Sequence, residues 1–225
     1  MSQSSAPQRP PFMEILGLLP PYSADDVAAA FRDKVMKAHP DRGGNAADFQ
    51  KLNEAFQQAN EYVAFRTSRR AWLAAQVEHY AAQEALAERL RQLGCALEME
   101  TFDWLRKSVG EDFAVVTERI DTIRCWNQPQ ADRVLAELTQ NQPMLDHVRT
   151  LDFTRSTLSD GQLLRLQGLP LLHTLILVGT PITRAGLENL TRFPQLQRLQ
   201  IGQSGVGVFG RWQLKWKYPR LKITS

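Results

Sequence analysis

Three six-residue segments share one pattern: VRTLDF at residues 148–153, LHTLIL at 172–177 and LQRLQI at 196–201. Each begins 24 residues after the previous one and carries apolar residues at its first, fourth and sixth positions. A fixed period of this length is typical of a repeat architecture, in which each unit stacks on its neighbour. We therefore predict that residues 148–225 form a stack of about three repeats, closed by a C-terminal cap.

The positions after each segment keep the same register. A small hydroxyl residue recurs at Ser156, Thr180 and Ser204, where its side chain can bond to the turning backbone. The remaining shared positions are apolar or proline: Leu158, Ile182 and Val206; Leu163 and Leu187; Leu166 and Leu190; Pro170 and Pro194.

This unit resembles a leucine-rich repeat in its bacterial 24-residue form. Because strand side chains alternate, the residues on either side of the core leucines face outward. Repeat stacks of this kind bind partners on that face. We predict a binding face for an unknown protein client; an equal alternative is a fold extension covered by helices of the middle region. The predicted face comprises Thr150, Asp152, Thr154, Thr174, Ile176, Val178, Arg198 and Gln200.

The net positive charge of the chain is concentrated at its C-terminal end. Residues 148–225 hold 11 Lys/Arg and 3 Asp/Glu, and Glu188 is the last acid. Trp212 and Trp216 interleave with basic residues there, a composition that can bind nucleic acid. We favour another interpretation, in which the two tryptophans seal the last repeat and the lysines stay in water.

The middle region, residues 64–147, is predicted to be helical. Its apolar residues recur at helical spacing, and Gly94 is expected to stop the helix. We favour a helix packed on its neighbours over a coiled coil or rigid spacer, because no heptad runs for three full repeats. Shorter helices are expected over about 98–108, 111–126 and 129–140. Cys125 and Trp126 are interpreted as core residues, and Cys95 and Cys125 as too isolated to form a redox pair.

The N-terminal part, residues 10–63, carries three helical patterns behind a polar arm at 1–9. The second helix opens at Ser23 and the third at Asn45, both good N-cap residues. Between them lies His39-Pro40-Asp41-Arg42, followed by two glycines. Two amphipathic helices joined by so short a connection are expected to pack antiparallel.

This segment resembles a J-domain, the co-chaperone module of DnaJ-like proteins. The matching residues are Phe31-Arg32, His39-Pro40-Asp41, Phe49, Leu52 and the run 53–56 (NEAF). The resemblance implies docking on a DnaK-type chaperone and stimulation of its ATPase. It makes Asp41 the contact to a chaperone arginine and His39-Pro40 the residues that shape the loop. The implied docking surface is completed by Phe31, Arg32, Lys34, Lys37 and Arg42.

Two features qualify the resemblance. Asp33 stands where many members of the family have a basic residue, which would weaken docking. No Gly/Phe-rich segment and no Cys-x-x-Cys repeats follow, as in J-proteins of the third class. The alternative function is an interaction scaffold with an inactive J-fold, and nucleic-acid binding through the basic tail is a less favoured third.

Composition and motifs exclude several classes. Two cysteines are too few for a disulfide framework or a four-cysteine zinc site, and we expect a cytoplasmic protein that does not engage membranes. The sequence contains no nucleotide-binding loop, metal-ligand cluster or nucleophile elbow. We therefore predict a mostly helical α+β protein that is not an enzyme and has no catalytic residue, metal or cofactor.

Overall fold

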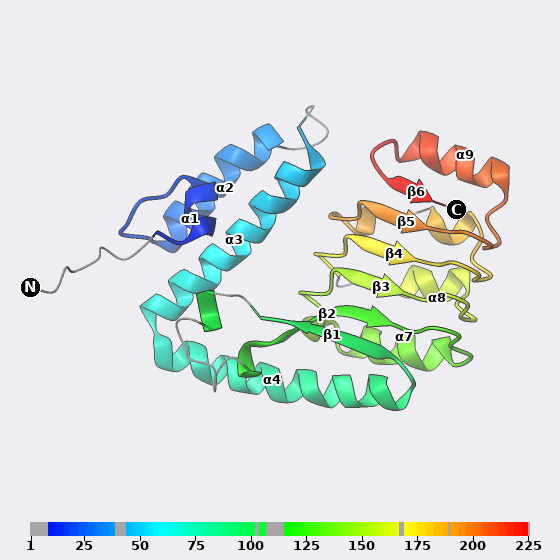
Figure 1. Cartoon of the computed structure of the whole chain (residues 1–225), viewed down its shortest axis with the longest axis horizontal. Helices are drawn as coiled ribbons and strands as arrows, with labels where there is room; N and C mark the ends of the chain where they lie inside the picture. The colour runs from blue at the N-terminus through cyan, green and yellow to red at the C-terminus, as the bar shows by residue number, and fades with distance from the viewer. Residues whose placement is uncertain are drawn as a thin grey trace, which may run out of the picture. The chain divides into compact units, whose positions relative to one another are not determined.

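The computed structural model describes residues 9–38, 44–101, 104–106, 115–166, 169–188 and 190–224. The protein is of the α+β class, with more helix than strand and one six-stranded sheet (Figure 1). It divides into two compact units, Met1–Gln76 with Phe102–Ser108, and Val77–Thr101 with Val109–Ser225. The expected domain boundary at residue 148 therefore lies inside the second unit.

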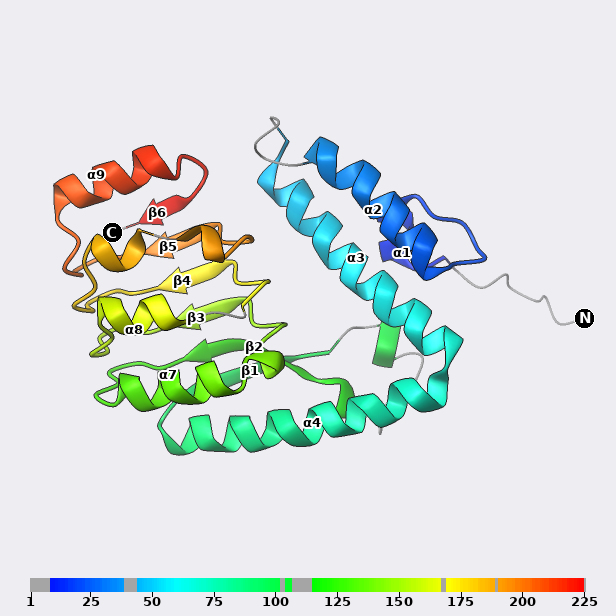
Figure 2. The same ribbon diagram turned by 180° about the vertical axis from the view of Figure 1, so that it is seen from behind.

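The first unit contains α1 (Pro11–Leu16), α2 (Ala24–Ala38) and α3 (Ala46–Thr67). The predicted N-caps are confirmed. The Ser23 hydroxyl accepts from the Asp26 amide at 3.1 Å, and Asn45 Oδ1 accepts from the Ala47 amide at 2.9 Å. In Figures 1 and 2, α2 and α3 lie side by side and run antiparallel.

The core of this unit lies between the three helices. The rings of Phe31 on α2 and Phe56 on α3 stack with centroids 4.1 Å apart. Trp104 adds an aromatic ring 5.4 Å from that of Tyr62 and 5.8 Å from that of Phe12. The buried residues of the core cluster between the helices are Phe12, Met13, Leu16, Val27, Leu52, Ala55, Ala59 and Val63.

The second unit is organised by its sheet, in which the strands follow one another in sequence order. β1 pairs antiparallel with β2, and every later pairing is parallel. The strands are β1 (Ala96–Glu100), β2 (Arg119–Arg124), β3 (Thr150–Asp152), β4 (Thr174–Ile176), β5 (Arg198–Gln200) and β6 (Lys222–Thr224).

The 24-residue register predicted from the sequence is confirmed in the sheet. Leu151 pairs with Leu175, and Leu175 pairs with Leu199. All three leucines are fully buried. The sheet continues in the same register to Ile223 on β6. Equivalent leucines therefore stack into one continuous apolar row.

Helical segments cover the leucine side of the sheet, as Figure 2 shows. They share one core with the strands, to which the second half of α4 adds Leu86 and Leu90. These segments are the second half of α4 (Arg69–Gln92), α7 (Ala131–Gln140), α8 (Asp160–Arg165), η4 (Ala185–Leu187), η5 (Leu190–Arg192) and α9 (Val208–Lys217), with short turns η2 (Val115–Thr117) and η3 (Gln142–Met144) between strands.

The prediction of helices over about 98–108 and 111–126 is wrong in two places. Residues 98–100 belong to β1, and residues 119–124 form β2. β2 instead begins an additional repeat, which the sequence analysis did not predict. Ile120, Ile123 and Cys125 occupy the positions that Val148, Leu151 and Phe153 occupy 28 residues later, and all six are fully buried. The predicted helix at 129–140 is confirmed as α7 and supplies the matching Leu135 and Leu138.

The two sides of β5 give a direct test of this packing. Leu199 is fully buried, whereas its neighbour Gln200 is half-buried on the opposite side. We expect Leu199→Ala to lower the free energy of unfolding by about 2–5 kcal/mol through the cavity it opens. Gln200→Ala should change it by less than about 0.5 kcal/mol. Urea denaturation of both variants makes the comparison, and equal losses would contradict the assigned strand orientation.

Candidate functional site

Two of the predicted docking residues lie exposed on α2. Arg32 and Lys37 both face solvent, and Lys37 Nζ lies 3.3 Å from Asp33 Oδ2. Both partners of this pair are well exposed, so the ion pair itself adds little stability. Asp33 nevertheless places a negative charge within the cationic surface. The predicted residues His39, Pro40, Asp41 and Arg42 lie outside the described residues.

The two other predicted docking residues of α2 have packing roles. Phe31 is half-buried against Phe56, so much of its ring is taken up inside the helix pair. Lys34 Nζ donates to the Ile15 carbonyl at 2.7 Å. This carbonyl lies in the last turn of α1, where a cation also complements the helix dipole. Lys34 therefore ties α2 to α1.

The second candidate surface is the side of the sheet opposite the leucines. Pairing arranges its side chains in rows across the strands. One row runs Thr122, Thr150, Thr174, Arg198, Lys222, and the next runs Arg124, Asp152, Ile176, Gln200, Thr224. Every predicted face residue in these rows therefore lies on one side of the sheet.

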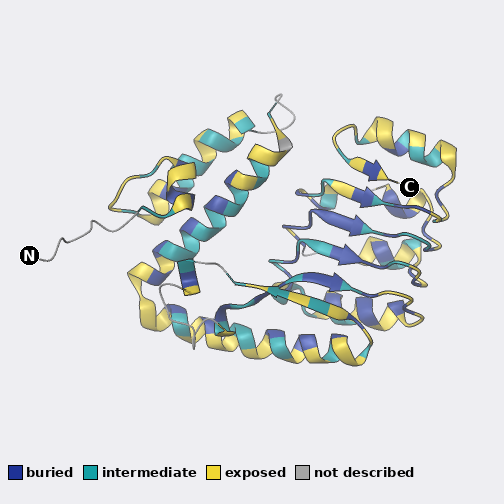
Figure 3. Ribbon diagram, viewed as in Figure 1, coloured by how far each residue is buried: buried dark blue, intermediate teal, exposed yellow. Residues whose placement is uncertain are grey.

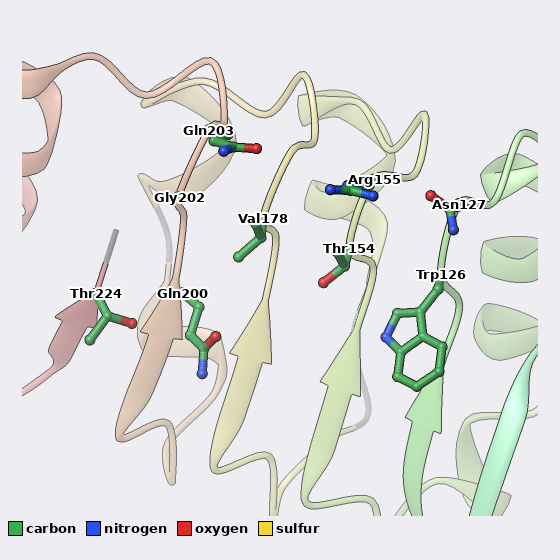
Figure 4. A pocket seen from close by; sticks show the side chains of 9 residues that line it. All are labelled: Trp126, Asn127, Thr154, Arg155, Val178, Gln200, Gly202, Gln203 and Thr224. Atoms are coloured by element: carbon green, nitrogen blue, oxygen red, sulfur yellow. The ribbon is translucent and has the colours of Figure 1, made fainter.

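A pocket of about 480 Å³ opens where the strands end (Figure 4). Its floor continues the sheet, because the Asn127 amide donates to Thr154, that of Arg155 to Val178 and that of Gly179 to Gly202. Gly202 has no side chain, which leaves the space open at this end. The lining residues are Trp126, Asn127, Thr154, Arg155, Val178, Gln200, Gly202, Gln203 and Thr224.

The turn at the end of each strand is itself a repeated feature. Asn127, Arg155, Gly179 and Gln203 occupy equivalent positions, and all four have positive φ, between 50° and 69°. Three of them are not glycine, although this conformation costs energy for other residues. The polar side chains of these three residues line the pocket.

Asp152 organises the polar side of this pocket. Its Oδ2 accepts from Trp126 Nε1 at 2.6 Å, and its Oδ1 accepts from the Thr154 amide and hydroxyl at 2.8 and 2.6 Å. Asp152 is buried beneath these groups. It therefore positions Trp126 and Thr154 and is not itself offered to a partner, which corrects its predicted role as a contact.

A charged pair flanks the indole. The Arg124 guanidinium lies 5.8 Å from the Trp126 ring centroid and forms an ion pair with Glu98. The hydrogen bond to Arg124 lowers the pKa of Glu98, and the same bond raises the pKa of Arg124. These contacts hold Trp126 over the sheet while half of its surface stays exposed.

The predicted face is thus only partly available. Thr154, Val178 and Gln200 line the pocket. Thr174 is buried, and its hydroxyl accepts from Arg198 Nε at 3.0 Å. Thr150 and Ile176 are half-buried, and Arg198 is exposed. The sequence reading missed Trp126, which it placed in the core, and the signal was the Ile-x-x-Ile-x-Cys pattern at 120–125 that precedes it.

Helix α9 corrects another expectation. Trp212 and Trp216 do not seal the last repeat, because they are 63% and 81% exposed. The buried residue is Leu214, which lies about 200° around the helix from each of them. Phe209 stacks on Trp212 and is also exposed. Figure 3 shows this helix as mostly exposed.

The described surfaces offer hydrogen bonding and aromatic stacking. Across the described ranges, no three His, Cys, Asp or Glu side chains gather in a way that could hold a metal ion. Within the same ranges, each helix is too short or too polar to cross a membrane. The polar groups of the pocket suit binding, and Arg155 is the only charged residue among the described residues that line it.

No protein-family model matches the sequence, and no curated protein matches it. A solved structure described as "Leiomodin-1 Actin-Binding Site 2 (ABS2)" is similar to 46% of this chain, over 68% of its own chain. The sequence identity is 14% and the TM-score is 0.39. A likeness at this level says nothing about the function of this chain.

The two neighbours Phe31 and Arg32 separate packing from docking on α2. We expect Phe31→Ala to destabilise the N-terminal unit by about 1–3 kcal/mol, because a half-buried ring stacked on Phe56 is lost. Arg32→Ala removes an exposed side chain and should change stability by less than about 0.5 kcal/mol. Thermal melting of the two variants tests this. A Phe31→Ala protein of unchanged stability would contradict the packing role and favour the predicted docking role of Phe31.

Proposed function

We propose that this protein is a co-chaperone that docks a DnaK-type chaperone through the α2–α3 hairpin and stimulates its ATPase. One observation carries the proposal: the segment with His39-Pro40-Asp41 joins two antiparallel helices, and the first of them exposes Arg32 and Lys37. An acidic partner surface would complement those cations. The role of Asp41 rests on the resemblance to a J-domain.

The repeat stack would then supply specificity. Its pocket contains an indole, a hollow at Gly202 and polar groups at the strand ends. A protein client could place one side chain in that hollow and hydrogen-bond to Thr154 or Gln200. The stack resembles leucine-rich repeats, and its polar side is the surface that such stacks use for partners.

Single-turnover ATP hydrolysis by a DnaK-type chaperone, with and without this protein, tests the proposal. We expect the original chain to accelerate hydrolysis and Asp41→Asn to lose nearly all stimulation, through docking weakened roughly ten- to a hundred-fold. Asp33→Asn should strengthen docking by roughly two- to five-fold at low ionic strength, because it removes a negative charge and releases Lys37.

The matched control is the melting temperature, which should stay nearly unchanged in both variants. Equal stimulation by Asp41→Asn and the original chain would refute docking through this loop. Absence of any stimulation at high concentration would leave the scaffold function, with an inactive J-fold.

A second candidate function, binding of single-stranded nucleic acid, is favoured by the exposure of α9. Phe209, Trp212 and Trp216 present their rings outward. Lys215 is exposed on the same helix, and residues 189–225 contain seven Lys/Arg and no acid. Outward rings with nearby cations can stack on bases and meet phosphates.

We expect a labelled single-stranded oligonucleotide to bind with an affinity that falls as salt rises. Replacing Trp212 and Trp216 together by Ala should weaken binding by roughly ten-fold or more. Trp126→Ala is the matched control, since it removes another exposed indole from the same unit. Fluorescence anisotropy measures all three proteins. Equal affinities would show that α9 is not the binding surface.

A further inference from the structure

Cys95 and Cys125 come together although they are 30 residues apart in the chain. Their sulfur atoms lie 2.9 Å apart, and both thiols are free and buried. Ala96 pairs with Arg124 at the adjacent position of the antiparallel β1–β2 ladder. The same register places Cys95 opposite Cys125, just beyond the ends of the two strands.

This position suits a covalent bond. Residues directly opposite in an antiparallel pair have Cα atoms about 4.5–5.5 Å apart. A disulfide spans Cα separations of about 4.4–6.8 Å. The strands therefore need no rearrangement for the two sulfur atoms to bond.

Main-chain hydrogen bonds to other elements anchor both cysteines. The Cys95 amide donates to the Leu90 carbonyl of α4 at 2.9 Å, and the Cys125 amide donates to the Asp152 carbonyl of β3 at 2.7 Å. The pair thus lies where the end of α4, the start of β1 and the end of β2 meet. A bond there would fix the first edge of the sheet to the helix before it.

We propose that Cys95 and Cys125 form a reversible disulfide when the protein meets a two-electron oxidant, either a peroxide or a small-molecule disulfide. The structure thereby assigns a covalent modification site to the start of the repeat stack. This inference is independent of chaperone docking, because it rests only on contacts within the second unit.

The two thiols have different roles in the reaction. The hydrogen bond from Cys125 lowers the pKa of Cys95, which favours Cys95 over Cys125 as the nucleophile. The same hydrogen bond, together with burial, raises the pKa of Cys125. Cys125 therefore keeps its proton until the second step.

With hydrogen peroxide the atoms and electrons balance in two steps. The Cys95 thiolate attacks one peroxide oxygen, the O–O bond breaks, and hydroxide leaves while a sulfenic acid forms. The Cys125 sulfur then attacks the Cys95 sulfur, the S–O bond breaks, and the hydroxyl group leaves as water with the Cys125 proton. Two electrons pass from the two sulfur atoms to the peroxide. A reductant thiol then reduces the disulfide back to the two free thiols and is itself oxidised to a disulfide.

Thermodynamic linkage gives a quantitative test. If the native fold holds the sulfur atoms together, it favours the disulfide by the same factor by which the disulfide favours the fold. The full-length protein is equilibrated in glutathione buffers, native and in concentrated urea, starting from both reduced and oxidised protein. Acid quenching, alkylation and mass measurement then count the free thiols.

The measured quantity is the buffer ratio, squared glutathione concentration over glutathione disulfide concentration, at which half of the protein is oxidised. We expect this ratio to be roughly 30- to 1,000-fold higher for the native protein than for the unfolded chain. Peptide mapping should find Cys95 joined to Cys125. A native ratio equal to or below the unfolded one would overturn the proposal, as would a glutathione adduct on Cys95 as the main product. Cys125→Ala is the matched control, which should give that adduct and no internal bond.

Discussion

The parallel ladder of main-chain hydrogen bonds through the repeats determines most of the second unit. The same bond recurs in each repeat: Cys125 N to Asp152 O at 2.7 Å, Phe153 to Ile176 and Leu177 to Gln200 at 2.8 Å, and Ile201 to Thr224 at 3.0 Å. A strand of three residues cannot bury its own apolar side chains. Each repeat therefore depends on its neighbours for a core, and the ladder fixes the register in which those side chains stack.

The same ladder decides which groups remain available for binding. Polar side chains across the strands satisfy one another first, as Asp152 does with Trp126 and Thr154, and as Arg198 does with Thr174. The pocket beyond the strands, where Gly202 contributes no side chain, stays open. The surface that we propose for binding is thus the part of the polar face that internal hydrogen bonding leaves open.

In the N-terminal unit, too, some side chains of α2 are engaged in packing while others stay at the surface. Phe31 and Lys34 hold α2 against α3 and α1, whereas Arg32 and Lys37 stay at the surface. The proposed docking function therefore depends on exposed cations and on the segment that joins the two helices. In the second unit, α9 carries cations together with outward aromatic rings. This combination suits the proposed single-stranded nucleic acid and not an acidic protein surface.

The sequence alone determined the features that repeat or that act locally. The 24-residue period predicted the pairing of Leu151, Leu175 and Leu199, and the N-caps Ser23 and Asn45 predicted where two helices begin. These signals are visible because each depends on residues a few positions apart or on a repeated spacing. The roles of His39, Pro40, Asp41 and Arg42 also come from the sequence and stay predictions.

Only the tertiary structure decided the rest. Ile120 and Ile123 lie three residues apart, a spacing that fits a helix and a repeat strand equally, and pairing with β3 selects the strand. Cys95 meets Cys125 through an antiparallel register that no local pattern encodes. From the sequence, Trp126 is expected in the core, and Trp212 and Trp216 are expected to seal the last repeat, but all three are exposed. They are exposed because smaller Leu and Ile side chains fill the buried face of the sheet or helix. Which face is buried is decided only when all the repeats pack together.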